Sequence, residues 1–292
     1  MDRGPVLVIG ATGRVGRLVV DELLRDRIPV RALTRRPEAA ALPPGAQVVR
    51  GDLTAPASLD AGLDGARAVF LVWTAPVATA EAVIARMVGN ASGSHRRVVL
   101  LSSPHQTPHP FFQQPNAMRG MHAEVERLLA AATTEAVVLR PGMFASNALR
   151  WWAPQVTRGN VVRWPYGAAE TAPVDERDVA AVAARVLLED RHGGGDHVLT
   201  GPESLSQAAQ VHAIGDAIGR PLRFDELTPD EFRREIAAAW PPAIADMLLS
   251  AWRAALGQPA YVTSAVRDIL GTPARTFPQW AADNAAALRG GA

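Results

Sequence analysis

The sequence contains no cysteine, and this absence excludes several kinds of site at once. Disulfides, thiolate nucleophiles, cysteine-ligated zinc and iron–sulfur clusters all depend on that side chain. Tyrosine is nearly as scarce, because only Tyr166 and Tyr261 occur in 292 residues. Long apolar runs are missing as well: the uncharged stretch from Ala68 to Ala80 contains Pro76 and is too short to span a bilayer.

Neither sign of charge dominates, since 30 basic and 29 acidic side chains leave a formal net charge of +1. A nucleic-acid partner is not expected, because binding phosphates requires an excess of Lys and Arg. With 48% apolar residues the chain is too hydrophobic to be disordered. The apolar run that follows Met1–Pro5 is too short for a signal peptide. We expect a soluble, cytoplasmic protein with no membrane partner, either a monomer or a homodimer.

Short β-branched runs alternate with amphipathic helical stretches through the first two-thirds of the chain. Strands are expected at residues 6–9, 30–33, 47–49, 69–72, 98–101 and 137–139, and helices at 13–25, 57–63, 80–88 and 120–132. Continuous apolar strands separated by helices are typical of a parallel sheet covered on both faces. The right-handed crossover rule then predicts an α/β fold with a doubly wound parallel Rossmann sheet of strand order 3-2-1-4-5-6.

The pattern changes after Pro141. Residues 178–188 predict a helix that returns to the sheet, and residues 207–218, 229–239 and 244–256 predict a mostly helical ending. We expect residues 1–150 to form the Rossmann domain, to which residues 171–200 return. Residues 201–292, with 151–170, are expected to form a smaller, mostly helical substrate-pocket domain over the carboxyl ends of the strands.

The turn between the first strand and the first helix reads Gly10-Ala11-Thr12-Gly13-Arg14-Val15-Gly16. Gly10 permits a tight turn, Gly13 removes a side chain where a pyrophosphate approaches, and Gly16 lets helix and strand pack closely. The helix N-terminus adds unpaired N–H groups and partial positive charge. An ordinary strand–helix turn is the alternative, but a strand before the motif and a helix after it favour dinucleotide binding.

The end of the second strand indicates which dinucleotide binds. An NAD site places Asp or Glu there to bind the ribose hydroxyls. This chain has Arg35 and Arg36 instead, with no carboxylate between Asp26 and Glu38. Two guanidinium groups favour a 2′-phosphate over a solvated basic turn. The sequence therefore predicts NADP(H) as the cofactor and residues 1–150 as the NADP-binding domain.

Several segments together resemble a known family. They are the glycine turn at 10–16, Arg35, Gly51-Asp52-Leu53, Leu139-Arg140-Pro141-Gly142, Asp175-Glu176-Arg177-Asp178-Val179-Ala180, Leu199-Thr200-Gly201-Pro202-Glu203 and Arg275-Thr276-Phe277-Pro278-Gln279-Trp280. They span nearly the whole chain and resemble atypical short-chain dehydrogenase/reductases of the NmrA-like group.

The resemblance implies further cofactor contacts. Asp52 and Leu53 would border the adenine, and residues 141–144, with Pro141 at one end and Phe144 at the other, would flank the nicotinamide. The residues expected on the ribose side are Thr74, Ala75 and Pro76.

Most reductases of this superfamily deliver a proton from a Tyr-x-x-x-Lys pair. The family's two positions hold Met118 and His122 here, and no lysine lies near either tyrosine. The stretch from Leu101 to Glu126 resembles the bacterial quinone-reductase branch, which also carries His in place of Lys. Reduction of an unactivated ketone is therefore not expected, whereas a quinone needs little acid catalysis because its reduced oxygen is a stabilised phenolate.

Two residues are candidates for catalysis. His122 would donate a proton near neutral pH, or else it is a helix-surface histidine. Ser103, with Ser102, lies where the superfamily places a hydroxyl that bonds the substrate oxygen, and a turn or helix-cap serine is the alternative.

Aromatic side chains suggest a pocket. A flat apolar site would be lined by Phe111, Phe112, Phe144, Trp151, Trp152 and Trp164, although packing of the smaller domain on the sheet explains any single one of them more readily. His105 and His109 have the spacing of a metal pair, but the surrounding prolines disfavour a helix and no third ligand is apparent. We predict no metal.

The leading hypothesis is an NADPH-dependent oxidoreductase that transfers hydride to a quinone, enone or similar conjugated carbonyl. The substrate would be a small aromatic or conjugated molecule. Two alternatives remain: a non-catalytic NADP(H)-binding redox sensor, and a non-redox biosynthetic enzyme on the same scaffold.

Overall fold

Seven parallel strands form the central sheet of the structure, a computed structural model that describes residues 4–89, 96–133, 135–189, 195–236 and 240–291. The strands are β1 (Val6–Ile9), β2 (Val30–Thr34), β3 (Gln47–Arg50), β4 (Ala68–Val72), β5 (Arg97–Leu101), β6 (Ala136–Pro141) and β9 (Gly195–Leu199). Their order is β3-β2-β1-β4-β5-β6-β9, and every neighbouring pair is parallel. The predicted order 3-2-1-4-5-6 is confirmed, and β9 extends it beyond β6.

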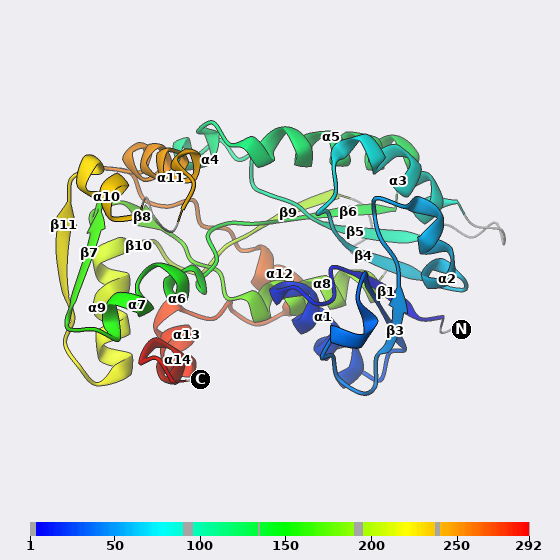
Figure 1. The fold of residues 1–292 in the computed structure, drawn as a ribbon, viewed down its shortest axis with the longest axis horizontal. Helices are drawn as coiled ribbons and strands as arrows, with labels where there is room; N and C mark the ends of the chain where they lie inside the picture. Colours follow the sequence, from blue (N-terminus) through cyan, green and yellow to red (C-terminus); the bar gives the residue numbers. More distant parts are fainter. Residues whose placement is uncertain (1–3, 90–95, 134, 190–194, 237–239, 292) are drawn as a thin grey trace.

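Helices cover both faces of the sheet (Figure 1). On one face lie α1 (Arg14–Arg25), α8 (Glu176–Leu188) and α12 (Ala265–Leu270), and on the other lie α2 (Asp60–Leu63), α3 (Ala80–Val88) and α5 (Ala117–Ala132). Short 3-10 turns are η1 (Pro37–Ala39), η2 (Pro56–Leu59) and η3 (Val77–Thr79). Within β1, Val6 and Val8 enter the core under α1 and α8, whereas Leu7 and Ile9 enter the core under α3 and α5. A strand buried on both faces explains its unbroken apolar sequence.

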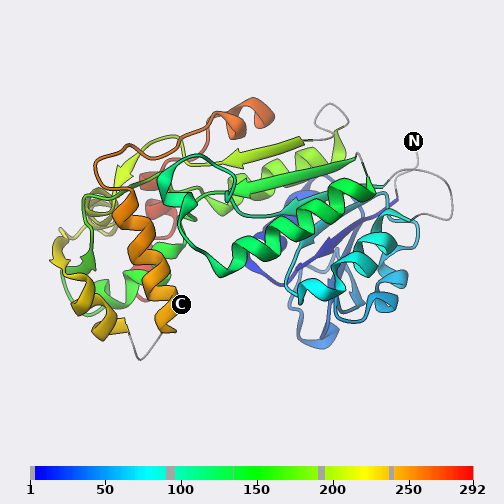
Figure 2. The ribbon, with the colours of Figure 1, turned by 90° about the horizontal axis from the view of Figure 1, so that it is seen from above.

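The rest of the chain forms a smaller part beside the carboxyl ends of the strands (Figures 1 and 2). Its helices are α4 (Pro110–Gln113), α6 (Asn147–Trp151), α7 (Ala153–Val156), α9 (Gln207–Ile218), α10 (Pro229–Ile236), α11 (Pro242–Ala254), α13 (Phe277–Asp283) and α14 (Ala285–Leu288). This part also contains two pairs of strands: β7 (Val161–Pro165) with β11 (Arg223–Leu227), and β8 (Glu170–Thr171) with β10 (Leu205–Ser206). The predicted helix at 229–239 begins as expected, and its residues 237–239 lie outside the described ranges.

The helical C-terminal part is thus confirmed, while the domain boundaries stay a prediction. Residues 265–270, expected in the smaller domain, pack as α12 against α8 and contribute Val266 and Ile269 to the core beneath the sheet. Across the described ranges, no helix combines the length and the apolar character that a membrane span requires.

Candidate active site

Two cavities lie over the carboxyl ends of the strands, where open α/β sheets bind their ligands. The first, of about 320 Å³, follows β1 to β4. Its lining comprises Ile9, Gly10, Thr12, Gly13, Leu33, Thr34, Arg35, Arg36, Gly51, Asp52, Leu53, Thr54, Val72, Thr74 and Ala75. Most of the residues predicted to hold the cofactor therefore share one cavity.

The glycine turn has the shape that a dinucleotide requires. Gly10 has a positive φ of 87°, which favours glycine. A Cβ on Gly16 would lie 2.1 Å from the Gly10 carbonyl oxygen, so helix α1 and the turn approach as closely as they do only because Gly16 has no side chain. The first N–H groups of α1 have no helical acceptor and face the turn that Gly13 leaves open. The turn fits a pyrophosphate.

Arg35 and Arg36 follow β2 at the rim of the same cavity and are exposed. Within the described ranges, neither guanidinium forms an ion pair, so both charges are available to a ligand phosphate. Across the cavity, hydrogen bonds from Thr54, assisted by the charge of Arg35, lower the pKa of Asp52. Thr54 donates its backbone N–H to Asp52 Oδ1 at 2.8 Å.

Four other predicted cofactor residues lie near this cavity without lining it. Arg14 is exposed at the first position of α1, whereas Val15 and Gly16 are buried beneath the turn. Pro76 is exposed, one residue beyond the lining.

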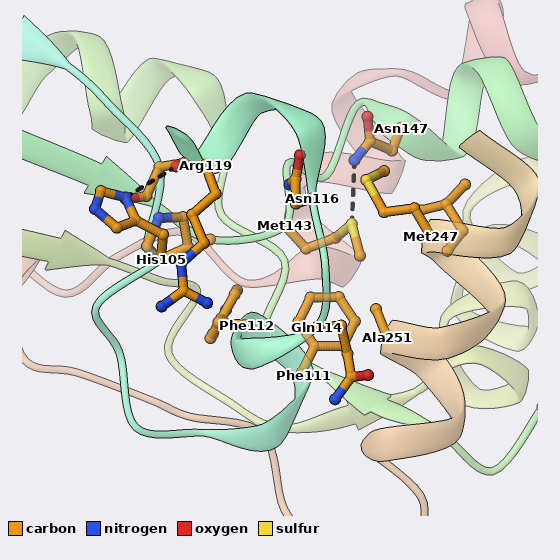
Figure 3. A pocket seen from close by; sticks show the side chains of 14 residues that line it. His105, Phe111, Phe112, Gln114, Asn116, Arg119, Met143, Asn147, Met247 and Ala251 are labelled. Carbon is orange, nitrogen blue, oxygen red and sulfur yellow. Dashed lines mark hydrogen bonds between the residues drawn. The ribbon is translucent and has the colours of Figure 1, made fainter. Parts of the chain in front are cut away.

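A second cavity, of about 200 Å³, follows β5 and β6 and reaches the smaller part of the chain. It is lined by Ser103, Pro104, His105, Phe111, Phe112, Gln114, Asn116, Arg119, Gly142, Met143, Asn147, Met247, Leu248 and Ala251 (Figure 3). Pro141 is buried at the end of β6 just before this lining. Phe144 lies just after it, partly buried against the core and bridged to Val174.

Ser103 and His122 meet at the wall of this cavity. His122, on α5, is half-buried, and its Nδ1 lies 2.9 Å from Ser103 Oγ. Burial lowers the pKa of His122, opposed by Glu126 and assisted by the neighbouring charges of His105 and Arg140. His105 also contacts this serine: its Nδ1 lies 3.1 Å from the backbone oxygen of Ser103 and 3.3 Å from the hydroxyl. Ser103 is thus in contact with two imidazoles.

A buried ion pair supports the segment that carries Ser103. Arg140 donates to Glu126 Oε1 at 2.6 Å and to the backbone oxygen of Ser103 at 3.3 Å. Ser102 also donates to Glu126, whose other oxygen lies 3.5 Å from His105 Nε2. Glu126 and Arg140 are 7% and 3% exposed, so their opposite charges are both removed from water and compensate each other.

The tyrosine position of the superfamily has no acidic group here. Met118 is 50% exposed and carries a thioether, which donates no proton. The sequence holds no lysine at any position. At this wall of the cavity, the described groups with an exchangeable hydrogen in contact with one another are the Ser103 hydroxyl and the imidazoles of His105 and His122.

The predicted aromatic residues divide between this cavity and the core of the smaller part. Phe111 and Phe112 line the cavity, and Met143, Met247 and Leu248 complete its apolar walls. Trp164 is 3% exposed and packs in the core of the smaller part, where Trp151 stacks on it with ring centroids 5.8 Å apart. Neither tryptophan lines the second cavity; both border a separate cavity beside α10.

The two histidines weighed as a metal pair have separate environments. His105 is buried beside Ser103, whereas His109 caps α4 and its Nε2 lies 3.0 Å from the Pro259 oxygen. Four residues of this site were not predicted from the sequence to act there: His105, Arg119, Glu126 and Arg140. The one local signal was the helical spacing of Arg119, His122 and Glu126, which puts all three on one face of α5.

Comparison with known proteins agrees with this geometry. A family model described as NAD(P)H-binding matches residues 10–190. The chain is 38% identical over 288 residues to the (4-alkanoyl-5-oxo-2,5-dihydrofuran-3-yl)methyl phosphate reductase of Streptomyces griseus, and this alignment covers 97% of the chain and 99% of the relative. It is 29% identical over 289 residues to the NAD(P)H azoreductase of Xenophilus azovorans, again over 97% of the chain and 99% of the relative.

Solved structures share the fold. The NADPH-dependent quinone oxidoreductase of Escherichia coli, complexed with NADPH, superposes with a TM-score of 0.77 at 24% identity, over 95% of this chain and 99% of the other. The Citrobacter triphenylmethane reductase complexed with NADP(H) gives 0.79 at 16% identity, over 96% and 99%. The glycine turn, the sheet and the family match agree. This chain belongs to the NAD(P)H-binding family and is an NAD(P)H-dependent oxidoreductase.

Proposed function

We propose that this oxidoreductase reduces a conjugated carbonyl, such as a quinone, an enone or an unsaturated lactone, and that it uses NADPH in preference to NADH. The observation that carries the proposal is the contact of Ser103 with His122, 2.9 Å long, at the wall of a mainly apolar cavity. A hydroxyl and an imidazole suffice for an acceptor whose reduced oxygen is already stabilised by conjugation.

The cofactor would occupy the first cavity and extend toward the second. The turn from Gly10 to Gly16 would hold its pyrophosphate, and Arg35 its 2′-phosphate. Asp52 and Leu53 would border the adenine. The predicted ribose contacts are Thr74, Ala75 and Pro76, and the predicted nicotinamide contacts are Pro141 and Phe144. When bound, NADPH supplies the hydride.

Ser103 would donate its hydroxyl hydrogen to the carbonyl oxygen as negative charge builds there. His122 in its protonated form would pass its Nδ1 hydrogen to Ser103 and end as neutral imidazole. Because burial lowers the pKa of His122, the protonated form is a stronger acid than an ordinary histidine but is less populated at neutral pH. The Arg140–Glu126 pair holds the Ser103 segment in place and is a positioning element.

The names of the relatives are consistent with this substrate class. The Streptomyces griseus enzyme is named for an alkanoyl-substituted oxo-dihydrofuran, which carries a conjugated carbonyl. The Escherichia coli structure is that of a quinone oxidoreductase. The Xenophilus azovorans relative is named as an azoreductase, and an azo group is likewise a conjugated acceptor.

The proposal is tested by the loss of NADPH absorbance with paired acceptors. We expect 1,4-naphthoquinone and 2-cyclohexen-1-one to be reduced and saturated cyclohexanone to remain unchanged. Ser103→Ala should reduce kcat/KM about 100-fold for the enone, and by less for the quinone, which needs less acid catalysis. Ser264→Ala, a change at an exposed serine on the far side of the sheet, is the control. Equal rates with cyclohexanone, or no loss of NADPH with any conjugated acceptor despite NADPH binding, would contradict the proposal.

A further inference from the structure

The second cavity contains a cation that the proposed reaction does not use. Its lining includes the guanidinium of Arg119 and the imidazole of His105, but no aspartate or glutamate. In Figure 3 these two side chains lie on one side of the cavity, across from Met247 and Ala251 of α11. The cavity is therefore apolar on one side and positively charged on the other.

Arg119 differs in its partners from the other arginines on or next to α5. Arg127 of the same helix pairs with Glu124 at 2.7 Å, and Arg140 pairs with Glu126. Over the part of the chain that the structure describes, the Arg119 guanidinium forms no hydrogen bond or ion pair, and only its backbone N–H is bonded, to the Asn116 oxygen. Its charge acts on the cavity, because it is one of the charges that lower the pKa of His105 after burial.

The carboxylates nearest to the cavity among the described residues already have partners. Glu126, which faces His105, accepts hydrogen bonds from Arg140, Ser102 and Gln106. Glu170, in the lining of the adjoining cavity, accepts one from Ser204. A cation in a partly desolvated cavity without a counter-charge gains most from an anionic group on a ligand. The amide nitrogen of Asn116, also in the lining, offers a further donor to the same group, since only the oxygen of that amide is engaged, by the Met118 N–H.

The position of Arg119 indicates that the anion and the reacting carbonyl belong to one ligand. Arg119 and His122 are three residues apart in α5, so they occupy the same face within one helical turn of about 5.4 Å. His122 contacts Ser103. Arg119 and Ser103 also line the same cavity of about 200 Å³, so one small ligand can offer its anion to Arg119 and its carbonyl oxygen to Ser103.

We infer that the natural acceptor carries an oxyanionic substituent (a phosphate, sulfonate or carboxylate) close to its conjugated carbonyl, and that Arg119 binds this substituent. The inference rests on the proposed function for the identity of the carbonyl. The recognition of the anion itself is a property of the cavity and can be measured without turnover.

The kinetic test compares 1,4-naphthoquinone-2-sulfonate with neutral 1,4-naphthoquinone. Each variant is compared with the unchanged protein on the same acceptor, so the different reactivities of the two quinones cancel. Arg119→Gln should lower kcat/KM for the sulfonate about 10- to 100-fold, the loss of one charge-assisted hydrogen bond, and leave the neutral quinone within about 3-fold. Arg119→Lys, which keeps the charge, should recover part of the preference. Arg127→Gln, on the same helix and outside the cavity lining, should change neither acceptor.

A binding test separates this inference from the proposed function. Phenyl phosphate, which cannot be reduced, is titrated into the protein loaded with NADP⁺, and phenol is titrated as the neutral comparison. We expect phenyl phosphate to bind more tightly than phenol, and Arg119→Gln to remove that preference. If neither quinone is reduced but this pattern holds, the proposed function fails and the anion site stands.

Two results would overturn the inference. One is equal binding of phenyl phosphate and phenol by the unchanged protein. The other is an Arg119→Gln variant that weakens NADPH binding or both quinones alike, which would assign the guanidinium to the cofactor or to the fold. Thermal melting of each variant identifies a loss that comes from unfolding.

Discussion

A buried carboxyl group next to the cofactor turn makes the stability of this protein depend on pH. Glu176 begins helix α8 and is 4% exposed. Burial raises its pKa from the ordinary 4.5 to about 7, and the charge of Arg14 only partly opposes this rise. Its carboxyl accepts a hydrogen bond from Ser146. Although a helix N-terminus favours a carboxylate, loss of water is the larger effect here.

The sign of the pH dependence follows from the proton count. Below pH 4.5 the carboxyl group is protonated in both the folded and the unfolded chain and contributes no difference. Between 4.5 and about 7 the unfolded chain releases its proton while the folded chain keeps it, so the free energy of unfolding falls as pH rises. One pKa unit corresponds to about 1.4 kcal/mol, so the total loss is about 3 kcal/mol, most of it between pH 5 and 8.

Glu176→Gln replaces the carboxyl group by a neutral group of the same shape. We expect the variant to be about 2–3 kcal/mol more stable than the unchanged protein at pH 8, and within about 1 kcal/mol of it at pH 5. Urea unfolding at both pH values measures this difference. Glu81→Gln, at an exposed carboxylate in the first turn of α3, is the matched control and should show no such gain. A gain of the same size at both pH values, or none at pH 8, would mean that the buried Glu176 carboxyl does not cause the pH dependence.

Three other predictions concern the two cavities. Arg35→Glu should weaken NADPH binding far more than NADH binding, by titration of each cofactor, and equal losses would mean that Arg35 does not contact the 2′-phosphate. Arg140→Met should reduce the free energy of unfolding, measured in urea, by about 3–5 kcal/mol, because it leaves Glu126 buried without its partner. The double variant Arg140→Met with Glu126→Leu should recover most of that loss. A double variant no more stable than the single one would contradict this explanation. For the enone, turnover limited by proton delivery should rise as pH falls below the ordinary histidine pKa of 6.5, since burial lowers the pKa of His122, and His122→Ala should flatten that profile.

The fold was predictable wherever strands are buried on both faces. The runs at Val6–Ile9 and Ala68–Val72 are apolar throughout because helices cover both sides of them. The seventh strand, Gly195–Leu199, is not predicted from the sequence, because it lies at the edge of the sheet and its first two residues are exposed. The pair β7 and β11 was missed for the same reason: Arg163, Arg223 and Asp225 leave little apolar pattern.

The residues of the first cavity were largely predictable from the sequence, whereas those of the second cavity were not. The glycine turn and Arg35 belong to a local motif, so their spacing in sequence carries the signal. Glu126 and Arg140 come together from α5 and β6 and are recognisable as a pair only once the sheet brings them within 2.6 Å. The placement of Trp164 depended on how large the aromatic cluster is, which no local pattern reveals.

Isotope transfer tests directly whether hydride passes from NADPH to a conjugated carbonyl bound beside Ser103. NADPH deuterated at carbon 4, on each face in turn, is incubated with the protein and 2-cyclohexen-1-one, and the product is analysed by mass spectrometry. We expect one deuterium per product molecule from one of the two labelled faces and none from the other. Product without label from either face, or binding of NADPH with no product across quinones, enones and unsaturated lactones, would contradict it.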